Sequence, residues 1–466
     1  MRRTKIVATI GPATDSREML TALVEAGIDI ARLNASHSPI DALQARFELI
    51  RSIAAEAGRH VAVLLDLAGP KLRVGAMAPG SVLQAGSAFR IEGRTCLGDE
   101  SHACVSYPGF ASDLSAGDHI LLDDGSLELK VVSTDGDRID TTVLVGGALT
   151  SNKGVNVPGV TLGIESITDK DREVLAWGLG VGVDLIAQSF VRSADDVREL
   201  RALMGDTPIP IVAKIEKHEA IDNMEAIVVV ADAVMVARGD LGVEMAPEQV
   251  PVLQVRIIQA AREAGKPVIV ATQMLESMKS APRPTRAEAS DVATAIFEGA
   301  DAVMLSAETA VGSYPIEAVA VTDRIVRAAE ESRSGPSAAQ GPDGVDVGRA
   351  VSAAVVRLAE DLELAAIVIA TQSGATARAV AAHRPSVPVV AVTPLPETAR
   401  RLSTVWGVVA LVVPLAQDTD AMLEIVLRAV LDSGLACPGR LVAITAGRAS
   451  RTPGATDFLV VREIPE

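Results

Sequence analysis

The chain has 466 residues, of which 48% are hydrophobic, and a formal net charge of −17; this length exceeds one ordinary domain and predicts about two to four. The acidic balance excludes nucleic acid and anionic membrane surfaces as main partners, because both bind basic faces. No apolar run reaches the roughly 18 residues of a membrane span, and Cys96, Cys104 and Cys437 are too few and too scattered for a disulfide framework or a zinc site.

The first 69 residues alternate short apolar runs with amphipathic stretches. This βαβ order predicts a parallel sheet. The first apolar run ends at Gly11-Pro12, too early for a secretion signal, and with the few cysteines this predicts a cytoplasmic protein. We expect strands at 5–10, 28–33 and 61–65 and helices at 16–26 and 40–56.

A different pattern begins at Gly69-Pro70 and continues to Pro158. It has short apolar runs, many turns such as Ala78-Pro79-Gly80, and no long helical period. We therefore expect residues 70–159 to form a separate all-β lid domain, a small β-barrel, inserted into the βα series.

The βα rhythm then returns, with five more strands expected. Three strands before the insertion and five after it make eight, which predicts a closed (β/α)8 TIM barrel built from 1–69 and 160–332. Residues 178–182 resemble a dinucleotide-binding loop, but they follow a helix and precede a strand, so we predict a turn there. The expected strands are 184–188, 209–214, 233–237, 268–271 and 302–305, and the helices are 168–177, 194–204, 247–264 and 286–298.

Residues 333–345 are polar and rich in Gly and Pro, which predicts a linker. Residues 346–466 form another α/β series, too short for a second barrel, so we expect an open-sheet domain. Near its first strand, the hydroxyls of Thr371, Ser373 and Thr376 and a helix N-terminus could hold an effector phosphate. The same pattern also fits a simple capped helix start. The expected strands are 365–370, 387–392, 408–413, 441–445 and 458–461.

In barrel enzymes chemistry gathers at the carboxyl ends of the strands, and polar side chains recur at those ends here. Glu216 and Asp240 would lie on neighbouring strands, where paired carboxylates can hold one Mg²⁺ (or Mn²⁺). Lys214 beside them could stabilise charge on a transferring phosphoryl group or an enolate; the alternative is a structural ion pair with Glu216. The recurring residues are Asn34, Ser36, His37, Asp66, Ser189, Lys214, Glu216, Arg238, Gly239, Asp240, Thr272, Ser306 and Glu308.

Cations near the same face suit a substrate with phosphate and carboxylate groups; they are Arg32, Arg73 and Lys153. Gly239 has no side chain, so its amide can approach a carboxylate closely. The chain contains no G-x-x-x-x-G-K-[ST] loop, so a nucleotide would have to bind in another way.

Several long segments resemble pyruvate kinase signatures, in the right order over nearly the whole chain. Residues 235–244 read Met-Val-Ala-Arg-Gly-Asp-Leu-Gly-Val-Glu, and residues 271–278 read Ala-Thr-Gln-Met-Leu-Glu-Ser-Met. The resemblance implies transfer of the phosphoryl group of phosphoenolpyruvate to ADP in glycolysis, giving pyruvate and ATP through a metal-stabilised enolate. Further segments similar to that family are 4–12, 153–159, 214–217 and 282–288.

The resemblance also implies roles for the matching residues. Glu216 and Asp240 would bind the metal, and Lys214 would stabilise the phosphoryl group and the enolate. The phosphates would lie on Arg32 and Arg73, the pyruvate carboxylate on Thr272 and the amides of Gly239 and Asp240, and the protonation route near Ser306 and Thr272. The nucleotide would contact Asn34, His37, Arg73 and Lys153, with Lys153 brought in by closure of the inserted domain.

One departure from the family pattern concerns potassium. Potassium-dependent members read Asp-Thr-Lys-Gly-Pro-Glu, whereas residues 66–71 here read Asp-Leu-Ala-Gly-Pro-Lys. A fixed ammonium at Lys71 can replace the charge of a bound K⁺, so we predict that K⁺ is not required; the alternative is a solvated surface lysine. The family's potassium ligands correspond to Asn34, Ser36, Asp66 and Leu67.

Two other functions fit parts of the pattern. A metal-dependent lyase or aldolase acting on pyruvate-like enolates could use the same carboxylate pair, but the inserted lid and the phosphate-binding cations favour a kinase. A silent sensor of phosphorylated metabolites would not need Lys214 with Glu216 and Asp240. The resemblance further implies a homotetramer and a sugar-phosphate or AMP effector.

Overall fold

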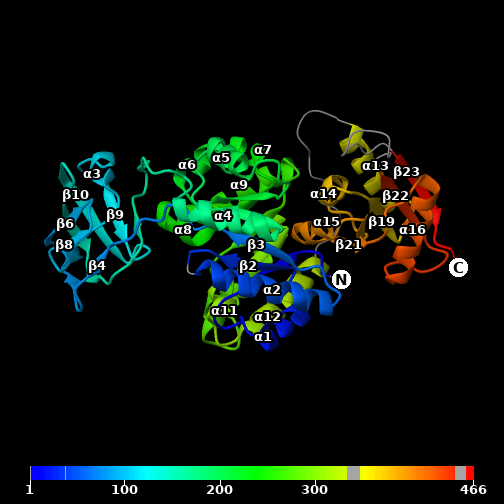
Figure 1. Cartoon of the computed structure of the whole chain (residues 1–466), viewed down its shortest axis with the longest axis horizontal. Helices are drawn as coiled ribbons and strands as arrows, with labels where there is room; N and C mark the ends of the chain where they lie inside the picture. Colours follow the sequence, from blue (N-terminus) through cyan, green and yellow to red (C-terminus); the bar gives the residue numbers. More distant parts are fainter. Residues whose placement is uncertain (1, 37, 333–346, 447–457, 466) are drawn as a thin grey trace.

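Eight parallel strands close into a barrel at the centre of the molecule (Figure 1). The computed structural model describes residues 2–36, 38–332, 347–446 and 458–465. The strand order around the barrel is β1-β18-β17-β16-β15-β14-β3-β2, and the predicted (β/α)8 fold is confirmed. Its strands are β1 (Lys5–Thr9), β2 (Ile30–Asn34), β3 (Ala62–Asp66), β14 (Leu185–Gln188), β15 (Ile211–Ile215), β16 (Ala233–Ala237), β17 (Val268–Ala271) and β18 (Ala302–Leu305).

Helices surround the barrel, and several begin where the sequence places a cap. Helices α4, α5 and α10 start at capping boxes formed by Thr168, Ser193 and Thr285, which satisfy amides that the first helical turn leaves unpaired. The barrel helices are α1 (Arg17–Ala26), α2 (Ile40–Glu56), α4 (Asp169–Val181), α5 (Ala194–Met204), α6 (His218–Asp222), α7 (Met224–Val230), α8 (Arg238–Glu244), η1 (Pro247–Gln249), α9 (Val250–Glu263), η2 (Glu276–Lys279), α10 (Arg286–Glu298), α11 (Ala307–Ala310) and α12 (Pro315–Ser332).

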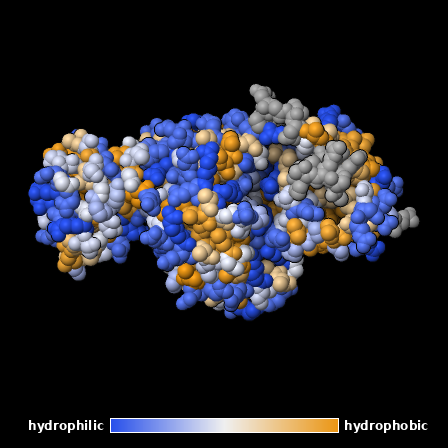
Figure 2. All heavy atoms as spheres, turned by 45° about the horizontal axis from the view of Figure 1, so that its top comes forward, coloured by the Kyte–Doolittle hydropathy of each residue, from blue (hydrophilic) through white to orange (hydrophobic). Residues whose placement is uncertain are grey.

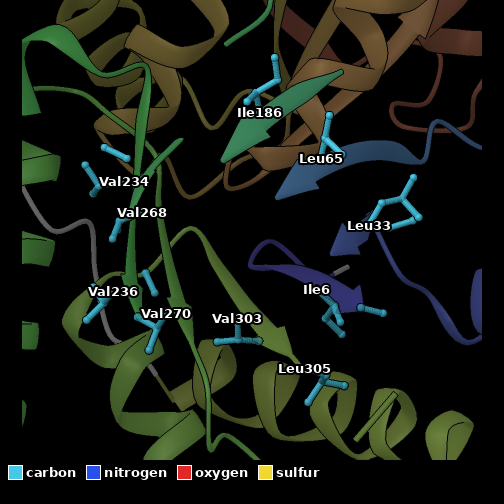
Figure 3. Packing of buried hydrophobic residues seen from close by; sticks show 14 of the residues in the cluster. Ile6, Leu33, Leu65, Ile186, Val234, Val236, Val268, Val270, Val303 and Leu305 are labelled. Carbon is cyan, nitrogen blue, oxygen red and sulfur yellow. The ribbon is translucent and has the colours of Figure 1, made fainter. Parts of the chain in front are cut away.

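The apolar side chains of the strands form two layers. Successive residues of a strand point to opposite faces, so Val7 lies inside the barrel whereas Ile6 packs outward under the helices. Figure 3 shows part of the outer layer, in which Leu65 and Ile186 project from the neighbouring strands β3 and β14, and Val234 and Val268 from β16 and β17. Because both faces of each strand are buried, the strands are continuous apolar runs in the sequence. Polar side chains therefore first appear at the strand ends.

The turn predicted over residues 178–182 is wrong for most of its length. Helix α4 continues through Val181, and only Gly182 leaves it, with φ 74°. The helix carries a glycine at position 178, where a Cβ would come 2.4 Å from Leu65 Cδ2. The glycine therefore permits close packing of helix against strand.

The lid projects from one end of the barrel and is built almost wholly from strands (Figure 1). A six-stranded sheet of order β13-β9-β10-β11-β6-β8 and two small strand pairs form it. The elements are β4 (Ala76–Met77), β5 (Val82–Leu83), β6 (Ala88–Glu92), β7 (Leu97–Gly98), β8 (His102–Cys104), α3 (Phe110–Asp113), β9 (His119–Leu122), β10 (Leu127–Asp135), β11 (Arg138–Val145), β12 (Gly147–Ala148) and β13 (Val155–Asn156).

The cysteine prediction needs a correction. Cys96 and Cys104 form a disulfide in the lid, and Cys437 is free and exposed. The two half-cystines stand only eight residues apart, and the strand pairing that brings them together (β6 with β8 and β4 with β7) is not apparent from their spacing.

The C-terminal domain lies at the opposite end from the lid and contains an open sheet (Figure 1). Its order is β21-β20-β19-β22-β23; all neighbours are parallel except β22 and β23. The elements are α13 (Val347–Asp361), β19 (Ala366–Ala370), α14 (Ala375–Ala382), β20 (Val389–Thr393), α15 (Pro396–Arg401), η3 (Leu402–Thr404), β21 (Val408–Val412), α16 (Thr419–Asp432), β22 (Leu441–Ala446) and β23 (Phe458–Glu463).

Hydrophobic residues remain exposed on the visible face of the central barrel and on the C-terminal domain, where they appear orange in Figure 2. Val229 is 70% exposed, Val252 62% and Phe297 50%. Within the described ranges, none of the helices combines the length and the apolar character needed to cross a membrane.

Candidate active site

A continuous set of hydrogen bonds joins five strands at the mouth of the barrel. Arg32 Nε donates to Asp66 Oδ2 at 2.6 Å, and Ser189 Oγ donates to Asp66 Oδ1 at 3.3 Å. Lys214 Nζ donates to Ser189 Oγ at 2.7 Å. Arg32 also donates to Thr9 Oγ1 at 3.0 Å. The structure thus brings Arg32 and Lys214 to the same side of the site, with Asp66 between them.

The opposite charges in this set stabilise the ionised forms of one another. Burial opposes ionisation of Asp66, but the adjacent Arg32 and Lys214 outweigh it and hold the pKa of Asp66 below its usual value. Burial likewise disfavours the charged form of Lys214, yet Asp66, Glu216 and Asp240 raise its pKa. Lys214 therefore stays cationic, as a group that stabilises phosphoryl or enolate charge must.

Glu216 is fully buried and only partly satisfied. Its Oε1 accepts the Phe190 amide at 2.7 Å. Its Oε2 lies 3.3 Å from Lys214 Nζ but accepts no hydrogen bond within the described ranges. Burial raises the pKa of Glu216 to about 7, and the charge of Asp240 adds to this against the opposing charge of Lys214. A buried carboxylate oxygen without a donor is an oxygen that a cation can take.

Asp240 lies in the first turn of α8, directly after β16. Lys71 Nζ donates to its Oδ1 at 3.0 Å and lies 3.8 Å from Asp124 Oδ1 of the lid. Lys71 is therefore not a free surface lysine. Its ammonium contacts Asp240 rather than Asn34, Ser36, Asp66 or Leu67.

The Gly239 amide donates to Thr272 Oγ1 at 2.7 Å. Thr272 and Gln273 have φ of 68° and 53°, a left-handed conformation that costs energy for side chains of this size. Arg238 stabilises this turn by donating to the carbonyls of Thr272 and Gln273, at 2.7 and 3.2 Å, and by pairing with Asp291. The strained loop holds the Thr272 hydroxyl beside the amide at the start of α8.

Ser306 follows β18 and its amide donates to Glu308 Oε2 at 2.7 Å. Its hydroxyl oxygen is buried and has no hydrogen-bond partner among the described residues. Glu308 also accepts the Leu275 amide, and burial raises its pKa. The carboxylate fixes the backbone and leaves the Ser306 hydroxyl available to a substrate or a water molecule.

The two lid cations lie apart from this set. Lys153 Nζ pairs with Asp123 Oδ1 at 2.8 Å, and Arg73 donates to the Asn152 carbonyl at 2.9 Å. Over the described part of the chain, neither makes a hydrogen bond or an ion pair with the barrel. In this conformation both cations therefore bond within the lid.

The positions that correspond to potassium ligands are partly engaged. Asn34 Oδ1 accepts the Ser36 amide at 3.0 Å, and the Leu67 carbonyl accepts Ser189 Oγ at 2.7 Å. Asp66 carries Arg32, as described above. His37, predicted to contact the nucleotide, lies outside the described residues.

The hydroxyls of the candidate effector loop partly cap the loop itself. Thr371 Oγ1 accepts the Gly374 amide at 2.9 Å, and Ser373 Oγ accepts the Ala375 amide at 3.4 Å. Thr376 is buried. These two hydroxyls bond amides at the start of α14, whereas its N-cap residue, Gly374, makes no side-chain cap, so the loop keeps both interpretations open.

A metal at the barrel mouth would have few protein ligands. No group of three or more His, Cys, Asp or Glu side chains arranged for a metal occurs in the residues that the structure describes. Glu216, with its unpartnered oxygen, and Asp240 still fit Mg²⁺, because this ion commonly takes one or two carboxylates and fills its other positions with water and substrate oxygens.

Sequence reasoning missed several contributors to this site. Phe190 donates its amide to Glu216 from a left-handed backbone, φ 54°, which nothing in the residue type signals. Arg238 was placed at a strand end but not recognised as the support of the Thr272 turn. Its position next to Gly239 indicates a residue of the site, but the carbonyls that it bonds lie about 35 residues away in the sequence.

Comparison with known proteins covers almost the whole chain. Residues 1–319 match the family model described as pyruvate kinase, barrel domain, and residues 349–462 match pyruvate kinase, alpha/beta domain. The chain is 45% identical to the pyruvate kinase of Mycobacterium tuberculosis (strain H37Rv) over 472 residues, covering 100% of this chain and 99% of that protein. It is 46% identical to pyruvate kinase 2 of Synechocystis sp., covering 99% and 79%.

A solved structure agrees with these sequence matches. A pyruvate kinase from Cryptosporidium parvum superposes with a TM-score of 0.93 at 33% identity, covering 100% of this chain and 96% of that one.

Proposed function

The chain belongs to the pyruvate kinase family, which transfers the phosphoryl group of phosphoenolpyruvate to ADP, and we propose that the residues at its barrel mouth perform that reaction in the roles given below. The observation that carries these roles is the bonded set of Arg32, Asp66, Ser189 and Lys214. Beside it lies Glu216 Oε2, which accepts no hydrogen bond from the described residues. This arrangement offers a fixed cation pair and a place for a metal, the two requirements of phosphoryl transfer.

Glu216 and Asp240 hold the metal, Mg²⁺ or Mn²⁺, in this proposal; the family generally uses Mg²⁺. When bound, the ion supplies positive charge to substrate oxygens. The ammonium of Lys71, which lies on Oδ1 of Asp240, would give up this contact when the carboxylate holds the metal. The buried, cationic Lys214 lies beside both carboxylates and stabilises negative charge on the transferring group and then on the enolate. Arg32, oriented by Asp66 and Thr9, holds the phosphate.

Thr272 and the amides of Gly239 and Asp240 bind the pyruvate carboxylate. The amide of Gly239 donates to Thr272 in this structure, so the substrate carboxylate would take the place of Thr272 as the acceptor of this amide. The turn itself is already formed. Ser306, whose buried hydroxyl has no partner in the described residues, lies on the water-linked route that delivers a proton to the enolate carbon. The proton adds to carbon as the enolate becomes the ketone.

Asn34, His37, Arg73 and Lys153 contact the nucleotide in this proposal. Since Lys153 and Arg73 now bond within the lid, nucleotide binding requires the lid to close and these contacts to be exchanged for phosphate oxygens. Closure also excludes water that would otherwise accept the phosphoryl group.

Potassium independence follows from the charge of Lys71. The ammonium of Lys71 lies on Asp240 Oδ1, at the base of the lid, and in this proposal it supplies the positive charge that K⁺ supplies in other members. Asn34, Ser36, Asp66 and Leu67 then need no ion, and the existing bonds to Asp66 and Leu67 are consistent with that.

We assign residues 1–69 and 160–332 to the catalytic barrel, 70–159 to the lid and 346–466 to a regulatory domain, with 333–345 as the linker. A sugar-phosphate or AMP effector would bind near Thr371, Ser373 and Thr376. A homotetramer is part of this proposal through the resemblance to the family. Phosphoenolpyruvate and ADP, the substrates, point to the cytoplasm.

A pyruvate-release assay with phosphoenolpyruvate, ADP and Mg²⁺, in potassium-free buffer and again with KCl, tests this proposal. We expect turnover in both buffers, and Lys71→Glu should make turnover depend on KCl. Turnover of the wild type only with KCl would overturn the role of Lys71. No turnover in either buffer, nor with sugar phosphates or AMP added, would overturn the assigned roles and favour the lyase or the sensor.

A further inference from the structure

Helix α8, which carries Gly239 and Asp240, ends in a buried carboxylate that no role above uses. Glu244 is 4% exposed as a residue, and its side chain is fully buried. Its Oε1 accepts two hydrogen bonds, from Lys217 Nζ at 2.8 Å and from Asn156 Nδ2 at 3.0 Å. A buried charge with partners of this kind fixes the segments that supply them relative to one another.

One of the two donors comes from the segment of a proposed metal ligand and the other from the lid. Lys217 directly follows Glu216, at the end of β15. Asn156 ends the last lid strand, β13, and pairs with Leu121 of β9. Glu244 therefore connects three pieces: the helix of one metal ligand, the strand end of the other, and the stem of the lid.

A second contact between lid stem and α8 differs in kind. Lys71 reaches Asp240 at the start of the helix, but a metal on Asp240 would displace it. The bonds of Glu244 at the other end of the helix involve no metal ligand, so they can persist when the metal binds. They would therefore still connect the lid stem to the metal-binding segments.

We propose that Glu244 is a positioning residue that sets the separation of Glu216 and Asp240 and transmits the position of the lid to them. This inference rests on the proposed metal site. Mg²⁺ tolerates little departure from near-ideal octahedral geometry. A shift of α8 relative to β15 therefore weakens metal binding although no ligand is lost.

Binding of Mn²⁺ alone, measured by electron paramagnetic resonance without substrates, tests the proposal apart from catalysis. Glu244→Ala should weaken Mn²⁺ binding about tenfold, the lower end for partners that orient metal ligands. It should also raise the Mg²⁺ concentration for half-maximal turnover by a similar factor. Glu244→Gln, which keeps an oxygen for Asn156, should have a smaller effect.

The ion pair makes a sharper prediction. Lys217→Met leaves Glu244 buried without its lysine, with His218 Nδ1 3.7 Å away from Oε2, whereas Lys217→Met combined with Glu244→Gln removes both charges of the pair. Because an uncompensated buried charge is worse than none, the double variant should bind Mn²⁺ more tightly than Lys217→Met alone. A purely additive loss in the double variant would overturn the coupling.

Asp232→Asn provides a matched control for general destabilisation. Asp232 pairs with Arg201 at 2.6 Å and accepts the Ile211 amide, at the opposite end of β15 and β16. This variant should lower the melting temperature and leave Mn²⁺ affinity unchanged. If the Glu244 variants behave in the same way, Glu244 is only structural and the proposal is wrong.

Asp240→Asn separates failure of this inference from failure of the metal site itself. It should weaken Mn²⁺ binding far more than any Glu244 variant. If Asp240→Asn binds Mn²⁺ like the wild type, the metal assignment fails and this inference with it. If Asp240→Asn weakens binding and Glu244→Ala does not, only the role of Glu244 is wrong.

Discussion

The barrel mouth and the lid hold their charged residues in different ways. At the mouth, Arg32, Asp66, Ser189 and Lys214 bond to one another across neighbouring strands. In the lid, Lys153 and Arg73 bond only to lid residues among those that the structure describes. The groups assigned to bond making are thus assembled before substrate arrives, whereas those assigned to the nucleotide must exchange partners as the lid closes.

The largest effect should come from a substitution in the set of residues that is already bonded together at the barrel mouth. Lys214→Met removes the cation shared by Asp66, Glu216 and Asp240, and should lower kcat about 10³-fold, as loss of one transition-state donor does. The measurement is steady-state pyruvate release. Lys266→Met removes a lysine that bonds a backbone carbonyl at the other end of the barrel and should leave kcat within about twofold.

The burial of Glu216 should appear as a pH dependence of stability in EDTA. Burial raises the pKa of Glu216 from the ordinary 4.5 to about 7. The contribution of this carboxyl group to the free energy of unfolding is therefore fully present below pH 4.5 and is lost as the pH rises through 7. Glu216→Gln has no such group to titrate. Between pH 4.5 and 7 its stability relative to the wild type should therefore rise by on the order of 3 kcal/mol. Denaturant unfolding at several pH values measures it; a difference independent of pH would contradict it.

The disulfide should affect the lid and not the barrel. Cys96→Ser with Cys104→Ser opens a loop of about nine residues and should cost the lid about 2–3 kcal/mol. Hydrogen exchange should speed up in β6–β8 and stay unchanged in β14–β16. Cys437→Ser, at an exposed free thiol, should change neither region. Faster exchange in the barrel would mean that the two regions are not independent.

The smallest effect should come from the lid cation. Lys153→Met should raise the KM for ADP about tenfold, equal to about 1.4 kcal/mol, and leave the KM for phosphoenolpyruvate within about twofold. Lys130→Met, at an exposed lysine of the same domain, serves as the control and should change neither constant. An equal rise in both KM values would show that the lid acts on the whole site.

The sequence predicted the barrel better than the contacts at its mouth. The apolar strands and the polar residues after them follow from burial on two faces, so Lys214, Glu216 and Asp240 could be placed on neighbouring strand ends. The pairing of Lys71 with Asp240 joins residues 169 apart, and Arg238 reaches a carbonyl 34 residues away. Such partners depend on how lid and loops pack, and no local pattern encodes them.

The most direct measurement of the central assignment is anomalous diffraction from a crystal soaked in Mn²⁺. The account predicts one peak between Glu216 and Asp240, about 2.1 Å from an oxygen of each, with the ammonium of Lys71 moved off Asp240. A peak elsewhere, or Lys71 still bonded to Asp240 in the presence of the metal, would contradict it.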